Sequence, residues 1–257
     1  MRREPGVGAE SPVDHRTKPR HRLLSELRSQ PQLFLPFLVA GLVTSLLGWL
    51  HRRDPIATVS SRTLADGHIS LEYIGFPAGV RGTTLSVESV LGLKLPFLAW
   101  GISAYILLLA VHAIAGTVVI ARVLGVEPTR RTVGSFFLYV ACIDLIYRGF
   151  GSIQGFQNMP VVIGLPILVV WIYVSVRLFA VPGLIVTRES VTEAVQESWR
   201  LTQGYGWPLF GVILGLGLTN AVFALFSVVG PALSTALVGS VHAVYLGLFV
   251  DQFASPD

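Results

Sequence analysis

Residues 201–250 read LTQGYGWPLFGVILGLGLTNAVFALFSVVGPALSTALVGSVHAVYLGLFV, a stretch without a single Asp, Glu, Lys or Arg. The hydrocarbon core of a bilayer is about 30 Å thick, and an α-helix crosses it with about 20 mostly apolar residues. The stretch is therefore long enough for two passes. The dipeptide Gly230-Pro231 supplies the break between them. We expect membrane helices over 207–229 and 232–249.

Composition supports this assignment. Of the 257 residues, 52% are hydrophobic and only 13% are charged, whereas about 25% of the residues of a soluble domain are charged. A second run without charge covers 95–121. These properties exclude the class of soluble proteins, and they make the lipid bilayer the first partner of the chain.

Four more apolar runs complete a predicted set of six transmembrane helices. They cover 32–50, 95–124, 132–151 and 161–181, and Pro182 with Gly183 is expected to end the last of them. The predicted fold class is an all-α integral membrane bundle, with short amphipathic interfacial helices and one long outer loop. The predicted organisation is a basic tail over 1–31 and a membrane domain over 32–257.

The long outer loop, 51–94, is rich in Gly, Pro, Ser and Thr. Within it, HISLEYIGF (68–76) alternates enough to favour a strand, and GFPAGVRGTT (75–84) supplies turn residues. We expect either a small hairpin or an interfacial cap over the bundle.

The distribution of Lys and Arg predicts the orientation in the membrane. With the N-terminus inside, the cytoplasmic segments carry about twice as many of these residues as the outer segments. We therefore expect a protein of the plasma membrane with both termini in the cytoplasm. The basic residues are topology signals beside apolar segments, so we expect no nucleic-acid partner.

Two segments have the pattern of interfacial helices. Residues 21–31 combine Leu23, Leu24 and Leu27 with basic side chains, and a solvated tail end is the alternative. Residues 190–203 form the second. There Ser190 and Glu193 match a capping box at the start, and Gly204 is a natural stop.

Asp144 and Arg148 are four residues apart in the predicted helix 132–151, hence on one face. Ionisable residues inside a membrane are costly and are functional candidates by default. One interpretation is a proton or ion relay in which Asp144 is the carrier. The other is a neutralised ion pair in which Arg148 reaches the outer interface.

Arg177 falls near the inner end of the helix 161–181, too far in depth to pair with Asp144. We expect it to extend toward the headgroups, where it would recognise anionic lipid, or to pair with Glu193 or Glu197.

His112, His242 and Asn220 are further polar residues within predicted membrane helices. The two histidines differ in expected depth, which argues against a shared metal site. Each of the three is expected to make a helix–helix hydrogen bond. The single cysteine, Cys142, is expected to be a small buried packing residue. The sequence lacks the P-loop, H-E-x-x-H and G-x-S-x-G motifs, so we expect no catalytic residue, no metal and no cofactor.

One pattern is shared with a known family. Residues 177–207, RLFAVPGLIVTRESVTEAVQESWRLTQGYGW, have an Arg near a helix end, then a Pro, then a short amphipathic helix. In that helix Ala194, Ser198, Trp199 and Thr202 occupy the matching positions. The entry LLSELRSQPQLFLPFLVAGLV (23–43) is also similar.

These segments, about a fifth of the chain, resemble the membrane domain of some glycerophosphoryl diester phosphodiesterases and its uncharacterised stand-alone relatives. The resemblance implies a six-helix bundle in a prokaryotic plasma membrane. It implies no activity, because the hydrolase reaction belongs to a separate metal-dependent domain. The long loop 51–94 departs from the short connection usual in that family.

Three hypotheses follow. The first is a non-enzymatic membrane scaffold that interacts with lipid, with protein partners or with a second copy of itself. The second is a small transporter or channel that uses Asp144 and Arg148. The third is an intramembrane enzyme acting on lipids, which ranks last because no nucleophile–base pair is visible.

Overall fold

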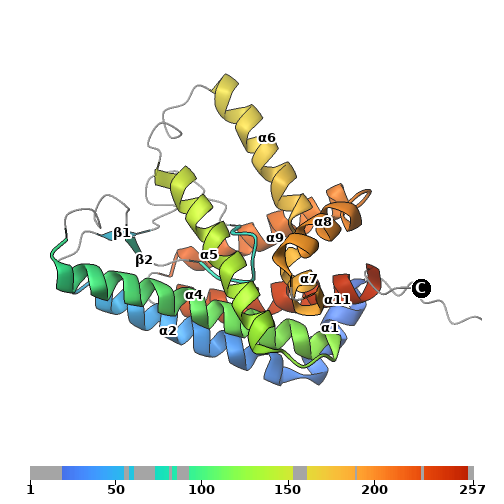
Figure 1. Ribbon diagram of the computed structural model, residues 1–257, viewed down its shortest axis with the longest axis horizontal. Coiled ribbons are helices and arrows are strands. Elements are labelled where there is room, and N and C mark those ends of the chain that lie inside the picture. Colours follow the sequence, from blue (N-terminus) through green and yellow to red (C-terminus); the bar gives the residue numbers. More distant parts are fainter. Residues whose placement is uncertain are drawn as a thin grey trace, which may run out of the picture.

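The computed structural model describes residues 19–54, 58–60, 73–80, 83–85, 93–152, 161–188, 190–226 and 229–253. This part of the chain is predominantly helical (Figure 1). Its helices are, in order, α1 (Pro19–Ser29), η1 (Pro31–Phe34, a 3₁₀ turn), α2 (Leu35–His51), α4 (Leu95–Leu124), α5 (Arg130–Ser152), α6 (Val161–Arg177), α7 (Val181–Arg188), α8 (Val191–Leu201), α9 (Gly206–Ala224), α10 (Gly230–Ser234), η3 (Thr235–Gly239, a π-helical turn) and α11 (Ser240–Phe253).

Five stretches of helix are long and apolar enough to cross a membrane. They are Pro31–His51, Leu95–Leu124, Val162–Arg188, Gly206–Ala224 and Gly230–Phe253. The chain therefore has the architecture of a multi-pass membrane protein. Helix α5, which carries Arg130, Arg131, Asp144 and Arg148, is not one of the five found within the described residues. The sixth predicted span stays a prediction.

The core is built on α4, which packs against both α2 and α11. Figure 1 shows α2 and α4 side by side along most of their length. Glycines permit the close approach of α2 to α10 and of α11 to α4. A Cβ on Gly41 of α2 would lie 2.6 Å from the Ala232 carbonyl oxygen, and one on Gly247 of α11 would lie 2.7 Å from Val123 Cγ1. The positive φ of Gly125, 66°, ends α4 in the left-handed conformation that glycine adopts without strain.

The predicted helix 161–181 ends early. Helix α6 ends at Arg177, three turn residues follow, and a new helix, α7, starts at Val181. Pro182 therefore lies in a first helical turn, where its missing N–H and fixed φ are tolerated, instead of terminating a helix. Residues 181–186 are all buried, so α7 is an internal element of the bundle. The last two predicted helices also shift, since α9 ends at Ala224 and α11 continues to Phe253.

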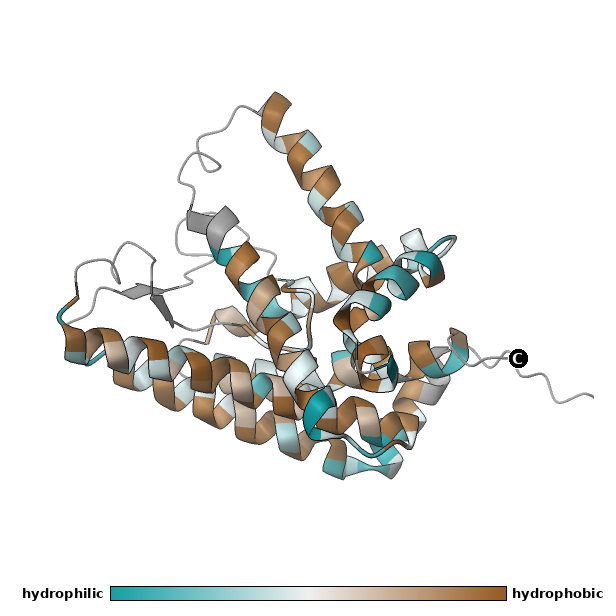
Figure 2. Cartoon of the chain, in the orientation of Figure 1, coloured by the Kyte–Doolittle hydropathy of each residue, from teal (hydrophilic) through white to brown (hydrophobic). Residues whose placement is uncertain are grey.

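Helix α6 differs from the other long helices in its exposure. Several of its apolar side chains, among them Val162, Leu165 and Val170, are more than half exposed, and much of its ribbon is brown in Figure 2. In Figure 1, α5 and α6 both extend toward the top of the view, away from α2 and α4. Apolar surface of this extent is the kind that lipid covers.

The long connection between α2 and α4 contains two short antiparallel strands, β1 (Thr58–Ser60) and β2 (Thr83–Leu85), in which Thr58 pairs with Leu85. The strand predicted over 68–76 is wrong for residues 73–76, which are irregular, and residues 68–72 lie outside the described part.

Residues 73–80, here named the inserted segment, do not cap the bundle but enter it. Ile74, Phe76 and Val80 of this segment are buried. Its backbone lies so close to η3 that a Cβ on Gly79 would collide with the backbone of Thr235. Irregular backbone is tolerated within a membrane protein where other protein groups or water form hydrogen bonds with its N–H and C=O groups.

Candidate functional site

The predicted ion pair on α5 is present. Arg148 Nε donates to Asp144 Oδ2 at 2.6 Å, and the carboxylate is 1% exposed. Tyr105 of α4 donates a second hydrogen bond to the same oxygen, at 2.7 Å. The Arg148 guanidinium lies 4.8 Å from the centre of the Tyr105 ring. The buried charge is thus neutralised and hydrogen-bonded, which is the condition under which a buried ion is tolerated.

This geometry favours the neutralised pair over the relay. A carrier must exchange its proton with water, whereas Asp144 is enclosed by partners from α4 and α5. The pair also joins two helices, because Tyr105 comes from a segment 39 residues away in sequence.

The other predicted polar residues are used in three different ways. His112 Nδ1 lies 2.8 Å from the Leu108 carbonyl oxygen of its own helix. Asn220 joins α9 to α10, since its side-chain oxygen accepts from Ser234 Oγ at 2.5 Å. Ser234 Oγ in turn accepts from Val80 N–H at 2.9 Å. The hydrogen-bonding role expected for Asn220 is therefore seen, and it extends to the inserted segment.

His242 departs from its expected role. Its ring packs between Tyr73 and Phe179, with centroids 5.6 Å from each, and its Nε2 has no hydrogen-bond partner among the described residues. Cys142 is also corrected, since it is exposed on α5. Nowhere in the described ranges do three His, Cys, Asp or Glu side chains gather as metal ligands would.

The inserted segment is the site feature that sequence reasoning missed. Tyr139 of α5 donates from its hydroxyl to the Gly75 carbonyl at 2.9 Å, and Gly75 has a φ of 79°. The available signal was the apolar content of YIGFPAGV, which is unusual for a solvent-exposed loop.

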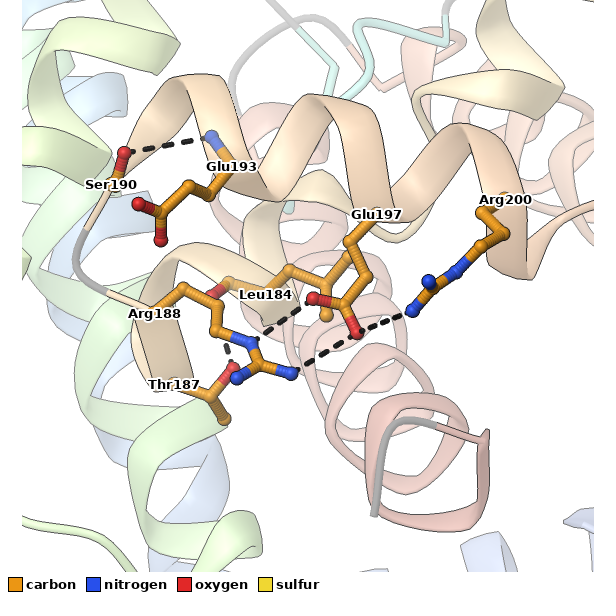
Figure 3. A network of polar contacts seen from close by, with 7 residues as sticks. All are labelled: Leu184, Thr187, Arg188, Ser190, Glu193, Glu197 and Arg200. Carbon is orange, nitrogen blue, oxygen red and sulfur yellow. Dashed lines mark hydrogen bonds and ion pairs between the residues drawn. The ribbon is translucent and has the colours of Figure 1, made fainter. Parts of the chain in front are cut away.

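Helix α8 is fixed to α7 by the polar network in Figure 3. Arg188 at the end of α7 makes a two-pronged contact with Glu197, with distances of 3.0 Å and 3.2 Å. Arg200 adds a longer contact of 3.7 Å to the same carboxylate. Glu197 therefore has two cationic partners, and neither of them is the Arg177 that the sequence suggested.

The start of α8 forms half of the expected capping box. Glu193 N–H donates to Ser190 Oγ at 3.5 Å, a long contact (Figure 3). Within the described residues, the Glu193 carboxylate makes no return bond to the Ser190 N–H. The predicted stop is present, because Gly204 has a φ of 84° just after the helix.

The matching residues of the predicted motif divide between two faces of α8. Ala194, Ser198 and Thr202 are buried. Ser198 Oγ donates to the Arg177 carbonyl at 2.7 Å, which attaches α8 to the end of α6. Thr202 Oγ1 donates to the Ser198 carbonyl oxygen at 2.9 Å. Trp199 faces the other way and is 39% exposed.

Arg177 lies in a notch, here named the α6–α8 notch, formed by Tyr173 and Trp199. Its guanidinium carbon is 5.0 Å from the centre of the Tyr173 ring and 5.6 Å from that of the Trp199 ring. Its Nη1 makes one long hydrogen bond of 3.4 Å, to the Trp199 carbonyl. Its Nε is buried without an acceptor, and within the described part of the chain no carboxylate pairs with it.

Comparison of the chain with protein-family models, with curated proteins and with solved structures gives no match in any of the three. The resemblance of residues 177–207 and 23–43 to the phosphodiesterase membrane domain therefore stays a prediction from those residues.

Proposed function

We propose that this chain is a non-enzymatic, six-span membrane protein that gathers anionic lipid at the cytoplasmic face of the plasma membrane. In this proposal α5 is the sixth span, both termini are cytoplasmic, and α1 and α8 are the interfacial helices that meet the headgroups. Protein partners assemble on the same face.

The observation that carries the proposal is the way α8 is held. An amphipathic helix that binds a membrane only transiently needs no contacts with the rest of the protein. In contrast, α8 is attached to α7 through Glu197 and to α6 through Ser198. Its outer face presents Trp199, and the chain that follows presents Tyr205 and, in the first turn of α9, Trp207. Trp and Tyr are the residues that concentrate at the headgroup level of membranes. Helix α8 thus forms a rigid platform at the depth where lipid headgroups lie.

The basic residues of α1 favour binding to negatively charged lipid. Helix α1 carries Arg20, Arg22 and Arg28 against the single carboxylate of Glu26. Its partly buried Leu23 and Leu27 pack against the core, which fixes the helix beside α11. Each basic residue near an anionic membrane surface contributes about 1 kcal/mol of attraction.

The test uses the full chain in phosphatidylcholine nanodiscs with and without phosphatidylglycerol. Lipid composition around the protein is measured by mass spectrometry against empty discs of the same lipid mixture. We expect enrichment of phosphatidylglycerol that falls at high salt and falls again when Arg20, Arg22 and Arg28 are all changed to Gln. Equal composition in loaded and empty discs would remove the proposal.

A second candidate, solute transport, is favoured by one observation. The inserted segment lies against the π-helical turn η3, and interrupted helices with irregular backbone between them build the binding sites of many transporters. Flux of small ions and amino acids into vesicles containing the protein, with empty vesicles as control, distinguishes the two candidates. Flux above the control that Asp144→Asn abolishes would favour transport through Asp144 and Arg148.

A further inference from the structure

We propose that the α6–α8 notch is a binding site for the phosphate group of an anionic phospholipid, with Arg177 as its recognition residue. This inference rests on the proposed function, and it assigns to one side chain the lipid contact that the proposal leaves to a whole face.

The first step of the argument is the unsatisfied charge. A guanidinium has five N–H donors and keeps its charge at any physiological pH. For Arg177 a single long hydrogen bond, to Trp199 O, uses one of them. Two other arginines, Arg188 at the end of α7 and Arg200 in α8, share the Glu197 carboxylate. A half-buried cation without a counter-ion is costly, and an anion from outside the chain is the missing partner.

The second step is the shape of the site. The rings of Tyr173 and Trp199 stand 5.8 Å apart by centroids and nearly perpendicular, at 81°. Both are close enough to the guanidinium for cation–π attraction, which holds the cation in place without neutralising it. Ser198 Oγ donates to the carbonyl oxygen of Arg177 and so fixes its backbone against α8. The cation is therefore presented in a fixed position.

The third step selects the class of anion. A phosphate diester offers two oxygens that match the planar fork of Arg. The aromatic walls are apolar, and beside them the α6 surface is exposed and apolar, as at Val169 and Val170. A ligand with a phosphate at one end and hydrocarbon at the other meets both surfaces at once. Free phosphate shares the oxygens but lacks the hydrocarbon.

The test titrates short-chain phosphatidylglycerol, short-chain phosphatidylcholine and inorganic phosphate into the detergent-solubilised full chain. Binding is followed by native mass spectrometry and by tryptophan fluorescence. The variants are Arg177→Gln and Arg177→Lys, and Arg200→Gln is the matched control on the 77% exposed neighbour. Circular dichroism and thermal unfolding establish that each variant is folded.

We expect phosphatidylglycerol to bind the wild type and Arg200→Gln within about twofold of each other. We expect Arg177→Gln to bind it about tenfold more weakly, the loss of one charge-assisted contact. Arg177→Lys should fall between them, because it keeps the charge and loses the fork. If Arg177→Gln does not fold, the Arg177→Lys comparison decides. Inorganic phosphate binding with the same dependence on Arg177 would support the phosphate site and assign it to the free anion.

Two failures are distinguishable. If wild type binds both lipids equally, the proposed function fails together with the site. If wild type prefers phosphatidylglycerol and both Arg177 variants keep that preference in full, the notch is not the site while the proposed function stands.

Discussion

The bundle interior and the α6–α8 notch each contain an arginine, and they treat it differently. In the interior, Arg148 meets Asp144 at 2.6 Å, and Tyr105 shares that carboxylate. In the notch, Arg177 has aromatic walls and one long hydrogen bond, but no carboxylate partner in the described residues. The comparison indicates that an arginine neutralised by a carboxylate of the chain stabilises the fold. An arginine without such a partner is a candidate for binding a ligand.

The largest expected effect comes from breaking the interior pair. Asp144→Asn leaves the Arg148 guanidinium without its counter-charge, and we expect the free energy of unfolding to fall by about 3 kcal/mol. The measurement is equilibrium unfolding in mixed detergent. The matched control is the double variant Asp144→Leu/Arg148→Met, which removes both charges and should recover more than half of the loss. An unchanged single variant would show that the pair carries no stability.

A second expected effect tests how tightly the interior is closed. Gly79→Ala forces the inserted segment away from the backbone of Thr235, and we expect a loss of about 2 kcal/mol. Gly211→Ala on α9 is the control, because a Cβ there meets no atom within 4 Å. We expect the control variant to be more stable than the wild type, by less than about 1 kcal/mol, because alanine has the better helix propensity. Equal effects of the two substitutions, in thermal unfolding, would contradict the placement of the segment.

The smallest expected effect concerns the attachment of the notch. Ser198→Ala removes the donor to the Arg177 carbonyl, at a cost of about 1 kcal/mol. Thr192→Ala, on the exposed side of the same helix, is the control and should change stability by less than about 0.5 kcal/mol. Limited proteolysis of the turn 202–204 provides a local measurement. Protection equal to that of wild type would argue that Ser198 does not hold α8.

The features predictable from sequence are those set by local rules. The range 95–124 coincides with α4, since hydropathy and the positive φ of Gly125 fix both ends. The Asp144–Arg148 contact follows from a spacing of four residues on one helix. The amphipathic character of α8, with Ala194 and Ser198 inward, is similarly local.

The features that sequence reasoning missed depend on contacts between distant segments. The inserted segment is held by Tyr139, 64 residues away from Gly75, and by Ser234, 154 residues away from Val80. No periodicity in residues 73–80 encodes either partner. Likewise the pairing of Glu197 with Arg188 instead of Arg177 depends on how α7 folds back beneath α8 (Figure 3), which Pro182 alone did not reveal.

The central claim is that the charge of Arg177 is satisfied by a lipid phosphate. The most direct measurement is a high-resolution structure of the full chain in nanodiscs that contain phosphatidylglycerol. We predict a headgroup phosphate within hydrogen-bond distance of the Arg177 guanidinium, between Tyr173 and Trp199. A carboxylate of the chain itself at that position, or a notch filled by acyl chain alone, would contradict the account.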